Sequence, residues 1–347
     1  MTRIGELHRD MATIYEVSEL AGVSLATVSR VVNGTAKVRQ STKDKVEAAM
    51  RELGYRPNTI AQSLASNRSN SVGILVPELI GPFYGALLSR IESLFRAAGK
   101  HVIIAAGHSD AELERDSIEF LQSRHCDALI LHVESVSDDY LVALAESECQ
   151  FALINRRVAA ISERCITLDN RLGGFLASEH LLALGHRNIG YISGPMWKQD
   201  AKERYAGHQQ ALMDFGVKEN QHAFFEGDFQ ETSGVAGLQY FIEQRIPISA
   251  LVCANDEMAA GALTAAHDLG ISVPEQLSIV GFDNTNFSHY TFPKLTTIDY
   301  PIAEIGAMAA RWVLAHVYQK PGEPLVSSFQ PKLVQRHSTF AARRESA

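Results

Sequence analysis

Two sets of residues in this sequence have side chains suited to binding other molecules, and the first set lies near the amino terminus. Leu25, Ala26, Ser29 and Arg30 share one side of a short helical pattern that begins after Ser24. Leucine and alanine can contact the methyl group of thymine, and arginine can bond to guanine or to a phosphate. These residue types on one helix face predict contact with DNA in the major groove.

The second set consists of polar and aromatic residues that follow predicted strands. Its members are Gly81–Tyr84, Asn155–Arg156, Asn255–Asp256 and Asp283–Asn284. Ligands of open parallel sheets lie beyond the carboxyl ends of the strands, so these residues are candidates for one binding site. The set offers no nucleophile with a base, no convincing acid pair and no metal cluster. Carboxylates and arginine that hold hydroxyls, with aromatic rings for C–H faces, favour a polyhydroxylated ligand.

Two short helices joined by a tight turn are expected to position the DNA-facing set. Thr13 and Glu16 form a capping-box pattern, which predicts that the first helix begins there. Gly22 suits a left-handed turn position, and Ser24 is the expected N-cap of the second helix. The expected apolar faces are Ile14, Val17 and Leu20 on the first helix and Val28, Val31 and Val32 on the second.

A third helix is predicted over residues 41–53, and it completes a small bundle. Patterning alone leaves open a plain three-helix bundle that binds no nucleic acid. Its inward residues are expected to be Val46, Ala49, Met50 and Leu53.

From residue 70 onward, apolar strand patterns alternate with helical patterns, which predicts parallel sheets with helices on both faces. This length favours two doubly wound subdomains, while periodicity alone leaves an eight-fold barrel as a rival. The sequence has no G-x-G-x-x-G or P-loop motif, so we expect no nucleotide cofactor. Predicted strands are 71–76, 101–105, 128–132, 151–154, 188–193, 250–253 and 277–282. Predicted helices include 81–98, 111–124, 172–184, 256–269 and 301–318, with Gly99, Gly185 and Gly270 at three of their C-termini.

Composition and charge limit the class of protein. The 347 residues suggest two or three domains, and the net charge of −8 argues against DNA binding by the whole surface. Residues 24–58 nevertheless hold seven Lys/Arg against three acids, which leaves −12 for the remainder. A basic headpiece on an acidic body would confine phosphate attraction to one end of the molecule.

The cysteines and the hydropathy pattern indicate a reducing, cytoplasmic setting. Cys126, Cys149, Cys165 and Cys253 are isolated, without metal-ligand or redox spacing, and most are expected to be buried thiols. We expect neither a signal peptide nor a membrane span, because no apolar run reaches 18 residues.

The amino-terminal region resembles the headpiece and hinge of the lactose/galactose repressor (LacI/GalR) family. Three runs carry this highly specific resemblance: Ala21–Asn33, Gly54–Asn58 and Ala61–Ala65. The family's operator-choosing residues fall on Leu25 and Ala26, and its minor-groove wedge falls on Leu64 in a hinge helix. The resemblance implies DNA contacts by Thr13, Tyr15, Ser24, Leu25, Ala26, Thr27, Ser29, Arg30, Asn33, Arg39, Tyr55, Asn58, Leu64 and Ala65.

One residue departs from the family pattern. Most members have a serine after the valine that precedes the third helix, whereas this chain has Arg39 after Val38. Arginine cannot act as an N-cap, so we expect the cap at Ser41 and a phosphate contact by Arg39.

The rest of the chain resembles the family's effector-binding core, which is similar to periplasmic sugar-binding proteins. The matching motifs include Glu203–Gly207, Asn255–Ala262 and Ser278–Asp283. Asp256 is expected to cap the following helix rather than to contact a ligand. The resemblance implies effector contacts by Phe83, Asn155, Asp200, Arg204, Phe229, Asn255 and Asp283.

The expected organisation follows the chain order of the family. We expect a disordered extension at 1–11, a helix-turn-helix headpiece at 12–58, a hinge at 59–69 and a tail at 341–347. One core subdomain is expected from 70–169 with 299–327, and the other from 170–298 with 328–340.

These features together predict a DNA-binding transcriptional regulator, most simply a repressor, that is controlled by a small sugar-type effector. We expect a homodimer, a near-palindromic operator and no cofactor, and the closest likeness is to the galactose-repressor branch. A sugar-binding transport protein would carry a secretory signal and no headpiece. A sugar-acting enzyme would need a carboxylate pair, which nothing in the sequence nominates.

Overall fold

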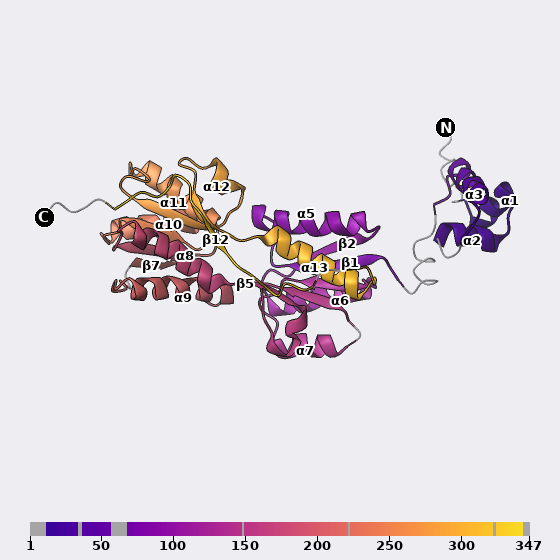
Figure 1. Ribbon diagram of the computed structural model, residues 1–347, viewed down its shortest axis with the longest axis horizontal. Coiled ribbons are helices and arrows are strands. Elements are labelled where there is room, and N and C mark those ends of the chain that lie inside the picture. Colours follow the sequence, from indigo (N-terminus) through magenta and orange to yellow (C-terminus); the bar gives the residue numbers. More distant parts are fainter. Residues whose placement is uncertain are drawn as a thin grey trace, which may run out of the picture. The chain divides into compact units, whose positions relative to one another are not determined.

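The computed structural model describes residues 12–33, 37–56, 68–147, 149–220, 223–321 and 324–342. The chain divides into two units, Met1–Asn70 and Ser71–Ala347. The first unit is helical and the second contains two α/β subdomains, which confirms the predicted fold class (Figure 1). The expected extension at 1–11 and the hinge helix, with Asn58, Leu64 and Ala65, lie outside the described residues.

The headpiece consists of α1 (Ile14–Ala21), α2 (Leu25–Asn33) and α3 (Gln40–Leu53). The predicted capping box is present at Thr13 and Glu16, and Gly22 ends α1 in the left-handed conformation with φ 64°. The Ser24 hydroxyl accepts a hydrogen bond from the Thr27 N–H at 3.3 Å, so Ser24 starts α2 as predicted. The buried core of this bundle consists of Val17, Ala21, Val28, Val46 and Ala49.

Two expectations for the headpiece are wrong. Leu20 is 46% exposed, because residues four apart, Val17 and Ala21, face the core of α1 instead. Arg39, not Ser41, occupies the N-cap position of α3, and no side-chain hydrogen bond caps that helix. The helix therefore begins at Gln40 with its first N–H groups uncapped by a side chain.

The first sheet has the order β11-β5-β4-β3-β1-β2, and all its pairings are parallel. Alternate residues of β1 face opposite sides: Ile74 packs with Leu87 of α5, whereas Leu75 packs with Leu121 of α6. Helices therefore cover both faces of this sheet. The strands are β1 (Ser71–Val76), β2 (His101–Ala106), β3 (Ala128–Leu131), β4 (Phe151–Ile154), β5 (Cys165–Leu168) and β11 (Ser328–Phe329). The helices are α5 (Pro82–Ala97), α6 (Ala111–Ser123), α7 (Asp138–Glu146) and α13 (Ile302–His316), with the 3-10 helix η1 (Ala159–Arg164).

The second sheet has the order β12-β10-β9-β8-β6-β7, and only its edge strand β12 is antiparallel. Helices α8 and α9 pack together, as do α10 and α11 (Figure 1). The strands are β6 (Ile189–Ser193), β7 (Phe224–Glu226), β8 (Ala250–Cys253), β9 (Ser278–Asp283), β10 (Thr296–Asp299) and β12 (Lys332–Val334). The helices are α8 (Asn170–Ala183), α9 (Gln199–Asp214), α10 (Glu231–Glu243), α11 (Asp256–Asp268) and α12 (Asn286–Tyr290).

The chain passes between the two sheets three times. The crossings follow β5, β10 and β11. Asp299 belongs to β10 of the second sheet, and Ser328–Phe329 form β11 of the first. The last two crossings therefore lie one and two residues later, respectively, than the expected limits at 298 and 327.

Among the described residues, the glycines at helix ends, the cysteines and the helix hydropathy can each be compared with the sequence predictions. Gly99, Gly185 and Gly270 have positive φ values, as predicted. All four cysteines are free, and Cys165 and Cys253 are buried while Cys126 and Cys149 are partly exposed. None of the helices in the described ranges is long and apolar enough to cross a membrane.

Candidate functional site

The predicted DNA-facing residues lie at the start of α2 and on neighbouring parts of the headpiece. Ala26 and Arg30 are exposed on α2, and Tyr15 is exposed on α1. Leu25 is partly buried, so its side chain both packs and remains accessible. The hydroxyls of Ser24 and Thr27 lie 2.9 Å apart at the amino end of α2, where backbone N–H groups favour anions such as phosphate.

The inner side of α2 holds this face in place. Val28 is fully buried, while Val31 and Val32 pack against the same core. Tyr55 packs there as well, which gives it a structural role beside its expected DNA contact.

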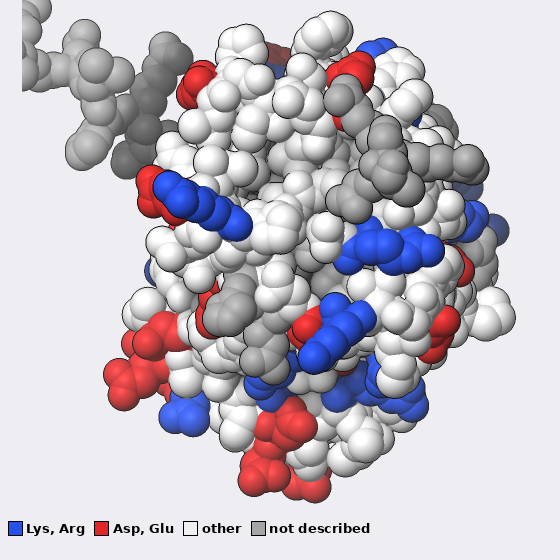
Figure 2. Space-filling model, turned by 90° about the vertical axis from the view of Figure 1, so that its left-hand side faces the viewer, with Lys and Arg blue, Asp and Glu red and all other residues white. Residues whose placement is uncertain are grey.

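The body carries no comparable basic concentration on the face seen in Figure 2. Lysine, arginine and acidic side chains are interspersed among uncharged residues on the described part of that face. In the headpiece, by contrast, Arg30, Arg39, Lys43 and Lys45 accompany few acids in the sequence, which favours phosphate attraction there.

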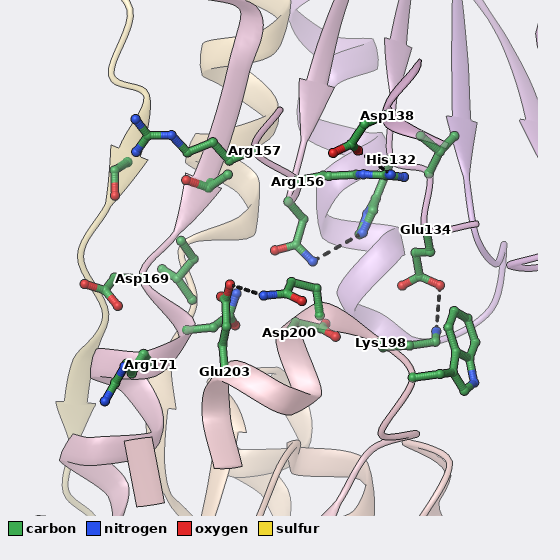
Figure 3. Close-up of a pocket in the computed structure, with 18 residues that line it drawn as sticks. His132, Glu134, Asp138, Arg156, Arg157, Asp169, Arg171, Lys198, Asp200 and Glu203 are labelled. Atoms are coloured by element: carbon green, nitrogen blue, oxygen red, sulfur yellow. Dashed lines mark hydrogen bonds and ion pairs between the residues drawn. The ribbon is translucent and has the colours of Figure 1, made fainter. Parts of the chain in front are cut away.

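A cleft lies where the carboxyl ends of strands from both sheets meet (Figure 3). It consists of two chambers. The inner chamber, of about 150 Å³, has Phe83, Arg204, Phe229, Asn255 and Asp283 in its lining, and the outer chamber, of about 820 Å³, has Arg156, Arg171, Trp197 and Glu203 in its lining. The two chambers are contiguous because they share lining residues from both subdomains. The shared residues are His132, Glu134, Asn155, Lys198 and Asp200.

Arg204 of α9 is the central cation of the inner chamber. It is only 3% exposed, and its guanidinium lies 3.8 Å from the centre of the Phe282 ring. Its Nε donates to Asn170 Oδ1 at 2.9 Å, and its Nη1 donates to the Ala254 carbonyl at 2.6 Å. These contacts fix the guanidinium plane, so Arg204 is a pre-positioned donor rather than a surface ion pair.

Asp283 at the end of β9 faces Arg204 with an unsatisfied oxygen. Its Oδ1 is buried without a hydrogen-bond partner and lies 3.7 Å from Arg204 Nη1, too far for a direct bond. Burial raises the pKa of this carboxyl well above its usual range, and the charge of Arg204 opposes that shift. A ligand hydroxyl at this place would satisfy an acceptor that the protein itself leaves unpaired.

Asn255 orients loops of the second subdomain that line the inner chamber. Its Oδ1 accepts from the Met258 N–H at 2.9 Å, so Asn255 caps α11. Its Nδ2 donates to the Phe229 carbonyl at 2.8 Å and holds that aromatic residue in place. The expectation that Asp256 caps this helix is wrong.

Asp256 has a different structural role. It is fully buried and accepts from the Thr285 N–H at 2.7 Å and from the Thr297 hydroxyl at 2.5 Å. Burial raises its pKa to about 7. The Asp256 side chain therefore ties Thr285, the N-cap of α12, and β10 to α11, and it lines neither chamber of the cleft.

Aromatic rings form the walls of the inner chamber. Phe83 packs edge-on against Tyr84 and Tyr300, with ring centres 5.3 and 5.0 Å away. Phe229, from the opposite subdomain, lies over Gly194, where any Cβ would overlap its ring. Two apolar walls with polar groups between them suit the faces and hydroxyls of a sugar ring.

The structure also places His132 in the lining of both chambers and buries Tyr300 against Asn155, and the sequence predicted neither residue as part of the site. His132 directly follows β3, and its Nε2 lies 3.4 Å from Asn155 Nδ2. Tyr300 donates to Asn155 Oδ1 at 2.8 Å. Burial lowers the pKa of His132, so its ring is neutral, and its Nδ1 has no partner. The predicted strand at 128–132 included His132, whereas β3 ends at Leu131, so the strand-end rule that selected Asn155 passed over His132.

An ion pair spans the cleft. Lys198, which precedes α9, lies 2.8 Å from Glu134, which follows β3 (Figure 3). The two side chains are 15% and 12% exposed. The pair links the two subdomains at the boundary of the inner and outer chambers. Among the described residues no group of histidine, cysteine and carboxylate side chains is arranged to hold a metal.

Comparison with known proteins matches both parts of the chain. A model described as bacterial regulatory proteins, lacI family, matches residues 13–58, and a periplasmic binding protein-like domain matches residues 178–339. The HTH-type transcriptional regulator GalR of Escherichia coli (strain K12) is 36% identical, over 97% of this chain and 98% of the relative.

Two solved structures share the architecture. The lac repressor dimer bound to operator and the anti-inducer ONPF has a TM-score of 0.84 and 30% identity, covering 96% of this chain and 100% of the other. The transcriptional regulator CelR in complex with cellobiose has a TM-score of 0.68 and 28% identity, covering 94% and 99%.

Proposed function

The chain belongs to the lacI family of bacterial regulatory proteins, and on this premise we propose that a sugar bound in the described cleft controls its affinity for DNA. It is a transcriptional regulator with a helix-turn-helix DNA-binding region and an effector-binding domain. Its relatives are regulators rather than enzymes. We propose that it acts as a repressor.

The unpaired Oδ1 of the Asp283 carboxyl group is the observation that carries the effector proposal. It lies in an inner chamber that also holds Arg204 and Asn255, between Phe83 and Phe229. This is a donor and acceptor set for vicinal hydroxyls, with apolar walls for the carbon face of a sugar. Cellobiose in the related CelR supports a carbohydrate effector.

A thermal-shift screen with Asp283→Asn tests the pocket. Sugars that bind the folded protein should raise its melting temperature, and the substitution should abolish that rise. Asp214→Asn is the matched control, because Asp214 lies at the end of α9, away from the cleft lining. An undiminished sugar-induced shift in Asp283→Asn would show that the pocket is wrongly assigned.

The proposed switch couples the cleft to the DNA-binding end. An effector that contacts both subdomains changes their relative angle, and this displaces the paired hinge segments. The coupling must be reciprocal, so operator DNA should change effector affinity by the same factor. The wedge residue Leu64 lies outside the described residues and stays a prediction: at fixed salt, Leu64→Ala should weaken operator binding.

We further propose that the protein is a homodimer that reads a near-palindromic operator. Support comes from Tyr290 and Phe292, whose side chains are 84% and 100% exposed beside a groove of about 1150 Å³ in the second subdomain. Exposed aromatic residues of this kind are typical of interfaces. Phe292→Glu should shift the sedimentation coefficient toward the monomer, whereas Phe215→Glu, on the α9 C-cap, should not.

A further inference from the structure

The outer chamber of the cleft contains a large aromatic residue that the inner chamber does not use. Trp197 lines the outer chamber and is 52% exposed. It lies between Pro195 and Lys198 in a turn closed by a 2.9 Å hydrogen bond from the Lys198 N–H to the Pro195 carbonyl. The N–H of the adjacent Met196 donates to Glu226 at 2.7 Å. The turn is thus fixed at both sides of the indole.

The groups beside the indole are those that bind sugar hydroxyls. Lys198 Nζ lies 5.3 Å from the ring centre of Trp197 and 2.8 Å from Glu134 Oε2. An accessible aromatic face with a charged donor and acceptor next to it can hold a sugar ring by its C–H face and its hydroxyls. Figure 3 shows Lys198 and Glu134 pointing toward each other at this place.

The sizes of the two chambers indicate more than one ring. The inner chamber, at about 150 Å³, falls below the roughly 300–1,000 Å³ of pockets that enclose larger ligands, and the outer chamber, at about 820 Å³, lies within that range. A single small ring placed on Asp283 and Arg204 would leave Trp197, which lines the outer chamber alone, without contact.

The charges of the outer chamber favour a neutral extension over a phosphate. Four cationic side chains in its lining are matched by five carboxylates. Two of the cations are already paired, Arg156 with Asp138 at 2.6 Å and Lys198 with Glu134 at 2.8 Å. An anion would meet no net positive field here, whereas hydroxyls find both donors and acceptors.

We propose that the effector is a neutral two-ring glycoside, with one ring in the inner chamber and the second stacked on Trp197. This inference rests on the proposed function, because it assumes that a sugar occupies the inner chamber. Trp197 is then a specificity-determining residue for the second ring.

Isothermal titration of the full chain tests the proposal with glucose and galactose against cellobiose, lactose and melibiose. At least one disaccharide should bind more tightly than its component monosaccharides. Trp197→Ala should lower the affinity for that disaccharide roughly 3- to 10-fold, the range expected for the loss of one ring contact. The affinity for monosaccharides should change by no more than about twofold. Trp197→Phe should restore most of the loss.

The outcomes separate this proposal from the one it rests on. Tight binding of monosaccharides alone, or equal weakening of both ligand classes by Trp197→Ala, overturns the two-ring assignment and keeps the sugar pocket. Binding of none of the five sugars overturns both. Because Trp197 is half exposed, its truncation should leave the unfolding transition unchanged, and circular dichroism melting checks this.

Discussion

The ion pair between Lys198 and Glu134 should couple the two subdomains by a measurable energy. Exposed pairs contribute about 0.2–1 kcal/mol, and breaking a buried pair costs about 3–5 kcal/mol. At 15% and 12% exposure this pair lies between those limits, so we expect a coupling energy of about 1–2 kcal/mol.

A double-mutant cycle measures that coupling. Glu134→Gln keeps the side-chain length and Lys198→Met shortens it by one atom, and each removes one charge. Urea unfolding of the two single variants and the double variant gives the interaction energy. Arg90→Met and Glu304→Gln form the control cycle, because that pair joins α5 to α13 within one subdomain and is 38% and 52% exposed. The control coupling should stay below about 0.5 kcal/mol.

The same pair should hold the cleft closed. A loss of about 1.4 kcal/mol of this coupling energy raises the population of molecules with an open cleft about tenfold. The radius of gyration from small-angle X-ray scattering should therefore increase in either single variant. Salt at 1 M should reduce the effect little, because the pair is mostly buried. A coupling energy indistinguishable from the control would refute the reasoning that burial strengthens this pair.

Three further outcomes are expected from other parts of the chain. Burial lowers the pKa of His208 to about 3, so between pH 6.5 and 3 the unfolded state binds more protons and the free energy of unfolding falls as the pH falls. His208→Gln should remove about 2 kcal/mol of the decrease in that free energy between pH 7 and 5, as measured by urea unfolding at each pH. Gly174→Ala should lower the free energy of unfolding by at least about 2–3 kcal/mol, because the added Cβ would overlap the Arg204 carbonyl. Gly22→Ala should lower it by only about 1 kcal/mol, because alanine is strained at a φ of +64°. Equal decreases would contradict the close approach at Gly174. Arg30→Gln should lower the slope of log affinity against log salt by about 2 per dimer if Arg30 contacts phosphate, and leave the slope unchanged if it reads a base alone.

The sequence predicts elements well where large apolar residues repeat. The strand at Phe151–Ile154 is as predicted, because a fully buried strand is a continuous apolar run in the sequence. The N-cap of α2 at Ser24 is as predicted, because a capping serine is recognisable from its residue type and place. The motif-based residues Arg204 and Asp283 do meet in one chamber, because α9, which carries Arg204, follows β6, and Asp283 ends β9 of the same sheet.

The elements that the sequence pattern did not mark are those whose packing uses small or polar residues. The buried face of α9 consists of residues such as Ala201, Gly207 and His208, so no apolar stripe marks it. Strand β10 buries Thr296 and Thr297, whose hydroxyls are satisfied only by partners distant in sequence. Likewise, the ion pair of Lys198 with Glu134 depends on how two subdomains meet, which local spacing does not specify.

The late crossing of the chain has a consequence for synthesis on the ribosome. Helix α5 ends at Ala97, but its packing partner α13 begins at Ile302 and fits so closely that Gly306 faces Leu87 and Ile91. About 200 residues separate the two helices, so at about 5–20 residues per second the part of α5 that packs against α13 stays exposed for roughly 10–40 s. The nascent first subdomain is therefore a candidate for chaperone binding, and release should coincide with emergence of α13.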